Sequence, residues 1–441
     1  MPKFEWRPWA VLGAFSLLQA LITVSIYTAL GVALPLMVHD EAWSWTEAGL
    51  GFTVIGACIG GSSYLPAILI RRFGVRTTLL LGTALVAGGL AVLGVTHNLA
   101  MYFLGAALCG VGYQMMALIP ANHVLAALFQ RKSSVLGLYF TIASAISAGG
   151  PLAVLGLLHV FHNDWRRLWL TETIVALAIG SVCALVTGGP AWLDRASAAL
   201  EARIAQDDAK PRRVQRVAPH RTRETWTVAQ AVRTPQFYIL LVAYFGHVIC
   251  LATTASFAMA HLTQQGVQPI VVGAMLTVEA LAGMAWRLLA GIMGDMVDAR
   301  YLLIFSLGAL VIGMGALSVA HGYASLIVFA VGTGVGFTVT PLAIMVLVPN
   351  YYGRAHNLEI FSTICLVGAL SALGPTFGGL MRDHFGGFSS TFQMFALLNA
   401  VAFVAALFMR PPRPRSPRPA EQPSAPEPPL MAGAAEFAEI A

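Results

Sequence analysis

Residues 110–113 read Gly-Val-Gly-Tyr, and residues 334–337, which lie 224 positions later, read Gly-Val-Gly-Phe. Two further segments recur at this offset without gaps. Gly150-Pro151 aligns with Gly374-Pro375, and the turn from Ala67 to Arg76 aligns with the turn from Gly291 to Arg300. Three matches at one offset are typical of an internal duplication. We therefore predict that the chain is built from two parallel copies of one unit.

The composition of the 441 residues places both copies in a lipid bilayer. Hydrophobic residues make up 57% of the chain and charged residues 10%, whereas soluble domains carry about 25% charged residues. A compact soluble body of this length could not bury so much apolar surface, which excludes an ordinary soluble enzyme and a disordered protein. The net charge of +6 does not indicate a nucleic-acid binder, because the basic residues lie between hydrophobic runs.

Charged residues, prolines and glycines divide the sequence into runs long enough to cross a bilayer, which takes about 20 apolar residues. We predict an all-α membrane protein with twelve transmembrane helices in two six-helix pseudo-repeats. The predicted spans are residues 9–38, 45–70, 77–96, 100–128, 134–161, 168–189, 236–264, 269–294, 301–320, 323–349, 357–381 and 389–409. The predicted segments are an N-terminal half at 1–190, a basic linker at 191–235, a C-terminal half at 236–410 and a disordered, proline-rich tail at 411–441.

The distribution of Lys and Arg predicts the orientation. An even number of spans puts both termini on one side, and 22 of the 26 Lys and Arg residues fall in the segments of that side. Arg166, Arg167 and Arg382 fall on the other side. Because positively charged loops stay in the cytoplasm, we expect a multi-pass protein of the bacterial inner membrane with cytoplasmic termini.

A duplicated membrane unit favours a substrate site near the middle of the membrane, between two copies that rock against each other. Small residues and helix breaks at matching positions suit such a moving interface. The residues that we assign to this conformational role are Gly74, Arg76, Gly150, Pro151, Gly291, Asp295, Gly374 and Pro375. The alternative is that the glycines serve only static helix packing.

Several motifs resemble a known family. The two halves of six spans and the basic turn Arg71–Arg76 after span two resemble the major facilitator superfamily over about residues 9–409. Three shorter stretches are similar to its monocarboxylate-porter and oxalate:formate-antiporter branch: Phe129–Ser133, Asp164–Arg166 and Thr234–Phe237. The resemblance implies the major facilitator fold and a protein that works as a monomer.

Two features depart from the family pattern. In the turn after span two, Arg71 stands where the family has an aspartate, whereas the equivalent position of the second half is an aspartate, Asp295. The acidic-Gly-Gly-aromatic signature of animal monocarboxylate carriers is absent from span one. The substrate range of the animal carriers is therefore not carried over to this chain.

Arg287 lies well inside span eight and leads to a prediction of the substrate. An arginine in a span costs about 2.5–3.5 kcal/mol on insertion scales, so it needs an anionic partner or a wet cavity. A guanidinium can hold both oxygens of one carboxylate. The resemblance agrees, because Trp286-Arg287 followed by Gly291 and Asp295 matches an arginine of the branch that is implicated in carboxylate binding. The alternative is a structural ion pair with Asp295 or Glu279.

The number of cations in the spans narrows the expected substrate. Span eleven contains no Lys or Arg, whereas the dicarboxylate-handling relatives use a second cation there. One buried cation balances one carboxylate, so we expect a monocarboxylate.

Glu279 lies eight residues before Arg287, about 12 Å along an ideal helix and about 80° around it, so direct pairing is not expected. An intramembrane carboxyl group can take up and release a proton, which would couple transport to a proton gradient. His247, His261 and His123 are further candidates for proton coupling, because histidine titrates near physiological pH. The alternative for each of these groups is a hydrogen-bonded structural role.

Neutral polar side chains on the spans can orient a carboxylate without adding charge. The candidates for substrate binding are Tyr27, Gln114, Asn122, Tyr139 and Ser256. The alternative is that they face the protein interior, as polar residues do in any helical bundle.

The sequence has no Gly-rich phosphate loop and no Cys/His metal spacing, so we expect no ATP, cofactor or metal requirement. The prediction is a secondary active transporter, not an enzyme, that moves a small organic anion with protons by alternating access. The alternatives are an organic-anion antiporter, an exporter of drugs or cationic compounds, and a sensor that binds an anion without moving it.

Overall fold

The computed structural model describes residues 6–116, 118–129, 132–187, 192, 195, 198, 226–293, 297–320, 322–353 and 356–412. Most of the predicted linker and nearly all of the predicted tail lie outside the described residues. The described chain is helical and contains no strand. Eleven of its helical stretches are long and apolar enough to cross a membrane, which confirms the predicted fold class.

The N-terminal half is a bundle of helices connected by short turns. Its elements are α1 (Trp6–Thr23), the π-helix η1 (Val24–Thr28), α2 (Ala29–Glu41), α3 (Trp45–Gly61), α4 (Leu65–Gly94), α5 (Leu99–Met116), α6 (Leu118–Leu128), α7 (Lys132–Ala148), α8 (Gly150–Val160) and α9 (Trp165–Thr187). The elements α1, η1 and α2 run on as one 36-residue stretch that forms span one.

The C-terminal half is also helical. Its elements are α11 (Val228–Ala231), α12 (Pro235–Gln264), α13 (Pro269–Met293), α14 (Ala299–Ser318), α15 (Tyr323–Tyr352), α16 (Asn357–Gly368), the 3₁₀ turn η2 (Ala369–Leu373), α17 (Gly374–Phe385) and α18 (Ser389–Phe408). Local sequence fixes several starts: Thr234 caps α12 ahead of a proline in the first turn, and Asp298 caps α14.

Span two differs from its predicted limits. The helix that starts at Trp45 ends at Gly61, and α4 starts at Leu65, so the end of the predicted span belongs to the next helix. Within α4 the backbone turns at Gly74, where φ is +83°, a conformation that glycine adopts without a Cβ clash. The segment from Leu65 to Gly74 thus completes span two, and the rest of α4 forms span three.

Spans five and eleven are interrupted at matching places. The helix α7 ends at Ala148 and α8 starts at Gly150, while η2 separates α16 from α17, which starts at Gly374. In both cases a proline follows in the first helical turn, where its missing N–H is not needed. The duplicated Gly-Pro pairs therefore mark the start of a new helix within each span.

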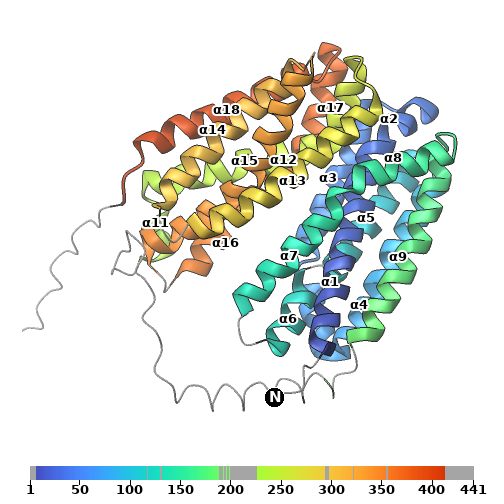
Figure 1. Cartoon of the computed structure of the whole chain (residues 1–441), viewed down its shortest axis with the longest axis horizontal. Coiled ribbons are helices and arrows are strands. Elements are labelled where there is room, and N and C mark those ends of the chain that lie inside the picture. Colours follow the sequence, from blue (N-terminus) through green and yellow to red (C-terminus); the bar gives the residue numbers. More distant parts are fainter. Residues whose placement is uncertain are drawn as a thin grey trace, which may run out of the picture.

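The two halves converge at one end of the molecule and diverge at the other (Figure 1). The converging end, which we call the closed end, holds the end of α2, the start of α3, the end of α12, the start of α13 and α17. Glycines bring the halves together here, since a Cβ atom at Gly49 would collide with the carbonyl of Pro375, and one at Gly379 with that of Trp45. The diverging end carries α6, α11 and α16 (Figure 1).

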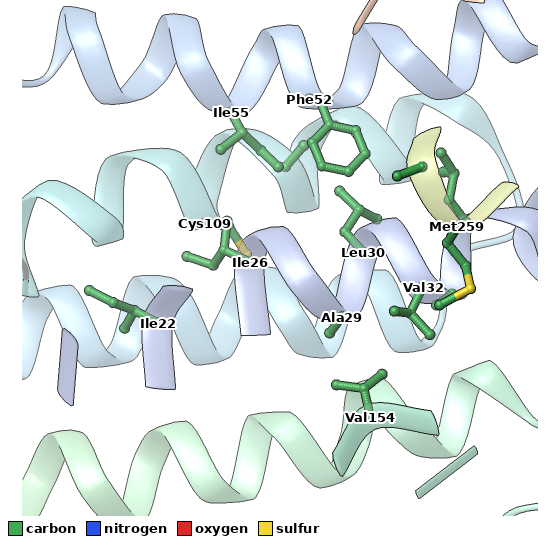
Figure 2. Close-up of a cluster of buried hydrophobic side chains, with 14 of the residues drawn as sticks. Ile22, Ile26, Ala29, Leu30, Val32, Phe52, Ile55, Cys109, Val154 and Met259 are labelled. Atoms are coloured by element: carbon green, nitrogen blue, oxygen red, sulfur yellow. The ribbon is translucent and has the colours of Figure 1, made fainter. Parts of the chain in front are cut away.

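The apolar core continues across the closed end. Figure 2 shows Met259 of α12 beside Val32 of α2, in one cluster with Leu30, Phe52 and Val154. Trp45 of α3 meets Phe388 and Phe257 edge-on, with ring centroids 5.2 and 6.1 Å apart. The two halves are thus packed together at the closed end by apolar side chains.

Candidate functional site

A cavity of about 350 Å³ lies between the two halves. Its walls come from α1, η1, α2, α7 and α8 on one side and from α12, α13 and α15 on the other. Ligand sites in proteins commonly have 300–1,000 Å³ and occur where two structural units meet. The cavity is therefore the candidate substrate site.

Arg287 lines this cavity from α13. The residues of α13 that reach the wall share one helix face, because they recur every three or four positions: Leu276, Glu279, Ala280, Gly283, Met284 and Arg287. The Nη1 atom of Arg287 donates a hydrogen bond of 3.1 Å to Oγ of Ser144 on α7, in the other half. Among the described residues, no carboxylate forms an ion pair with this guanidinium.

Glu279 lies in the same wall, eight residues before Arg287 on α13. It makes no ion pair with Arg287, so that alternative for the arginine is not what the structure shows. The other alternative partner, Asp295, lies outside the described residues. One cationic and one acidic side chain therefore face a single cavity at separate positions.

Tyr27 is the one predicted neutral residue that lines the cavity, and η1 explains its position. Thr23 and Val32 both reach the wall, although nine residues of a regular helix would place them about 180° apart. The π-helical turn between them is wider and turns through a smaller angle per residue. The side chains of Thr23, Tyr27, Thr28 and Val32 can therefore face one cavity. The ring of Tyr27 packs edge-on against Tyr113, with centroids 6.0 Å apart.

The other predicted substrate-binding residues do not line the cavity. Tyr139 is buried, and its hydroxyl donates to Oε1 of Gln19 at 2.8 Å. Ser256 donates to the carbonyl of Ala252, and Gln114 donates to the carbonyl of Ile59. Asn122 is exposed on α6. The polar groups of the first three are satisfied by hydrogen bonds inside their own half, which is the arrangement that the alternative expects.

The three histidines also lie away from the cavity. His261 is buried against Phe392, and its Nε2 lies 2.9 Å from the carbonyl of Leu317. His247 is buried with Nδ1 3.2 Å from the carbonyl of Tyr244, and His123 is exposed on α6. The structure therefore leaves Glu279 as the proton-coupling candidate that reaches the cavity.

The predicted conformational residues fall into three groups. Pro151 lines the cavity, and the adjacent Gly150 packs against Val24 at the start of η1. Gly374 packs against α12 in its own half, and the carbonyl of Pro375 lies against Gly49 of α3 at the contact between the halves. Gly74 bends α4 and Arg76 is exposed beside it, Gly291 lies in α13, and Asp295 is outside the described residues.

Sequence reasoning missed several hydroxyl groups of the cavity. They are Thr23, Thr28, Ser144, Ser147, Thr254 and Thr338. The spacing of Ser144 and Ser147 places them on one face of α7, which was a usable signal. It remained ambiguous because hydroxyls in apolar helices commonly bond to their own backbone, as Ser147 does to the carbonyl of Ala143.

Sequence reasoning also missed a buried polar pair behind η1. Oγ of Ser25 donates to Oε2 of Glu172 on α9 at 2.5 Å, and both side chains are buried. Ser25 belongs to the π-helical turn that also carries Tyr27. The pair therefore connects that turn to α9 on the side away from the cavity.

The sequence matches the family model of the Major Facilitator Superfamily over residues 15–369 and again over residues 240–435. The chain belongs to this superfamily. As a superfamily member with many apolar spans, it is a multi-pass membrane transporter of small molecules and not an enzyme.

Individual relatives are distant from this superfamily member. Monocarboxylate transporter 6 of Mus musculus is 30% identical over 147 residues, which is 32% of this chain and 29% of that protein. Among solved structures, the nucleoside transporter NupG superposes with a TM-score of 0.69 at 12% identity, covering 91% of this chain and 100% of that chain. The D-xylose-proton symporter gives 0.65 at 16% identity, covering 92% and 97%. The two structural matches, at 12% and 16% identity, show the fold alone.

Proposed function

We propose that this transporter moves a monocarboxylate together with a proton by alternating access, in an inner membrane with both termini in the cytoplasm. The observation that carries the proposal is Arg287, which faces the cavity between the halves and has Ser144 as its hydrogen-bond partner. A guanidinium in a membrane cavity binds an anion to offset its charge.

The choice of a monocarboxylate rests on the charges around the cavity. Arg287 is the one basic side chain among the described residues that line it. A dicarboxylate would bring a second negative charge with no second cation to balance it. The partial similarity to a monocarboxylate transporter supports the same substrate class.

Proton coupling is assigned to Glu279, the acidic side chain in the cavity wall. A carboxyl group that releases its proton on one side of the membrane and takes one up on the other converts a proton gradient into substrate movement. The proposed orientation puts the closed end on the outer side of the membrane, so the structure represents the inward-facing arrangement.

The test of substrate binding is counterflow of a radiolabelled monocarboxylate in proteoliposomes. Arg287→Lys retains the charge and loses the planar fork, which is worth about 1.5–3 kcal/mol in a charge-assisted pair, so we expect the apparent affinity to fall about 10- to 100-fold. Lys substitution at Arg300, which bonds to the backbone near the end of α18, is the matched control. Near-normal uptake by Arg287→Lys would exclude the assignment.

The test of proton coupling uses Glu279→Gln, which keeps the shape and cannot release a proton. We expect counterflow to persist, while uptake driven by an imposed pH gradient is lost. If the pH gradient drives substrate accumulation in Glu279→Gln to the same level as in the parental protein, Glu279 is not the proton-coupling residue.

The same assays separate the alternatives. An exporter of cationic compounds needs the acid and tolerates Arg287→Ala, whereas an organic-anion antiporter shows counterflow and no response to a pH gradient. A sensor that binds without transporting accumulates no label in counterflow.

A further inference from the structure

The cavity carries its cation at one end and mostly apolar side chains at the other. Four of the lining helices place an apolar residue nearest to the closed end: Val32 of α2, Pro151 of α8, Met259 of α12 and Leu276 of α13. Glu279 lies one turn from Leu276 on α13 and is the acidic residue of this end. Toward the diverging end the same wall carries Arg287 and the hydroxyls of Ser144, Ser147, Thr23 and Thr338. A cargo that fills this space meets a cation at one end and, beside Glu279, mainly apolar side chains at the other.

The length of the cavity follows from α13. Leu276 and Arg287 both line it and are eleven residues apart, which is about 16 Å along a helix axis. The opposite wall runs antiparallel, because Ser144 meets Arg287 while Leu152 and Leu155 approach Gly273. An acid of one to three carbons bound at Arg287 would leave most of this length empty of cargo.

The two charged groups also argue against a short zwitterion. Glu279 lies about 12 Å along the helix from Arg287, whereas the ammonium and carboxylate groups of an α-amino acid are attached to neighbouring atoms. Such a molecule could engage only one of the two side chains.

We propose that the cargo is an amphiphilic monocarboxylate with an aromatic or medium-chain apolar body, bound with its carboxylate at Arg287 and its body directed to the closed end. This inference rests on the proposed function and narrows its substrate class. Each methylene that leaves water for an apolar wall tightens binding about fourfold. Affinity should therefore rise with the length of the apolar body.

The experiment measures ligand-induced thermal stabilisation of the purified full-length transporter, which follows mass action and yields a dissociation constant for each acid. The probes are two matched pairs, butyrate with octanoate and lactate with 3-phenyllactate. Octanamide, which lacks the carboxylate, reports partition into the detergent micelle. We expect the larger acid of each pair to bind at least tenfold more tightly, with no stabilisation by octanamide.

Two alanines of α13 provide a matched pair of variants. Ala280 lines the middle of the cavity, whereas Ala285 is exposed on the other side of the helix. Ala280→Leu shortens the space for the apolar body, so the octanoate-to-butyrate affinity ratio should fall at least tenfold. Ala285→Leu adds the same side chain outside the cavity and should leave that ratio unchanged.

The outcomes separate this inference from the proposed function. If butyrate and lactate bind as tightly as their larger counterparts, and this binding is lost in Arg287→Lys, the amphiphilic cargo is wrong and the monocarboxylate function stands. If no acid stabilises the protein, both fail. If the octanoate-to-butyrate affinity ratio of Ala280→Leu equals that of the parental protein, the proposed direction of the apolar body is also wrong.

Discussion

At the scale of single residues, the contact between Arg287 and Ser144 joins the two halves across the cavity proposed as the substrate site. In the structure the serine hydroxyl accepts a hydrogen bond from the guanidinium. A bound carboxylate offers stronger acceptors to the same N–H groups. Under the proposed function, cargo binding and the bond between the halves would therefore compete for one side chain.

Removing this hydroxyl gives the first prediction at this scale. Ser144→Ala deletes the acceptor and should lower the stability of the ligand-free protein by about 1 kcal/mol. With saturating 3-phenyllactate the difference should shrink, because the carboxylate then satisfies Arg287. The measurement is thermal unfolding with and without the acid.

The control for this variant lies one turn away. Ser147 lines the same cavity and bonds to the carbonyl of Ala143 in its own helix, so Ser147→Ala removes the same atoms without touching Arg287. A loss of stability in Ser144→Ala that is equal with and without ligand would contradict the competition.

The charged residues of the cavity could be predicted from the sequence, whereas its neutral polar residues could not be distinguished from interior ones. Arg287 and Glu279 stand out because a charge in a span is costly and must face water or a partner. Tyr139 and Tyr27 are equally conspicuous in the sequence, yet one bonds to Gln19 in the interior and the other lines the cavity. A hydroxyl is satisfied in either place, so its presence does not indicate which one it occupies.

At the scale of elements, the packing of α3 against α17 determines how tightly the closed end is held. Gly379 lets α17 approach the carbonyl of Trp45, and Gly49 lets α3 approach that of Pro375. The repeat drew attention to Gly374 and Pro375 through their counterparts in the first half. Gly379 could not be singled out, because its importance depends on which backbone atom lies opposite.

Gly379→Ala tests this packing. The added Cβ would collide with a backbone carbonyl that has no freedom to rotate away, and forcing extra atoms into such a contact costs about 1–3 kcal/mol. We expect a lower melting temperature and greater accessibility of the closed end to a thiol reagent in a variant with Phe257→Cys. Gly387→Ala, at a position with open space around the new Cβ, should leave both values unchanged.

At the scale of the whole molecule, Asp383 connects the two halves at the closed end. Its carboxylate oxygens accept hydrogen bonds from the backbone N–H groups of Trp45 and Thr46, at 3.2 and 2.9 Å, in the first turn of α3. Free amides and the positive end of the helix dipole favour a negative charge there. A side chain of one half thus caps a helix of the other.

A reversible cross-link across this contact tests whether the halves must separate during transport. Thr46→Cys with Asp383→Cys places two thiols where the parental side chains are hydrogen-bonded to each other. Oxidation should abolish counterflow and retain ligand-induced thermal stabilisation, and a reductant should restore counterflow. Each single-cysteine variant is the control, and unchanged counterflow in the oxidised double variant would show that the closed end need not open.

The helical architecture could be predicted from the sequence, whereas the conformation could not. Apolar runs of about 20 residues must become spans because the bilayer leaves no other way to satisfy the backbone. The closed end is different, because Trp45, Gly379 and Asp383 would give the same hydropathy pattern with that end open or shut. Whether this end is open or shut depends on contacts between residues of the two halves, such as Trp45 and Asp383, that lie more than 300 positions apart in the chain.

The wide turn from Val24 to Thr28 has a consequence for how span one is compared with other sequences. The turn changes the angular position of every later residue around the helix axis. A single 3.6-residue period therefore cannot predict which helix face a residue occupies both before and after the turn. Deleting a single residue there would rotate Tyr27 about 100° away from its present direction while the span kept its hydrophobicity. A sequence alignment with a one-residue gap misplaced at this turn would therefore match cavity-lining positions of one protein with buried positions of another. The hydrophobicity of the span would not reveal the error.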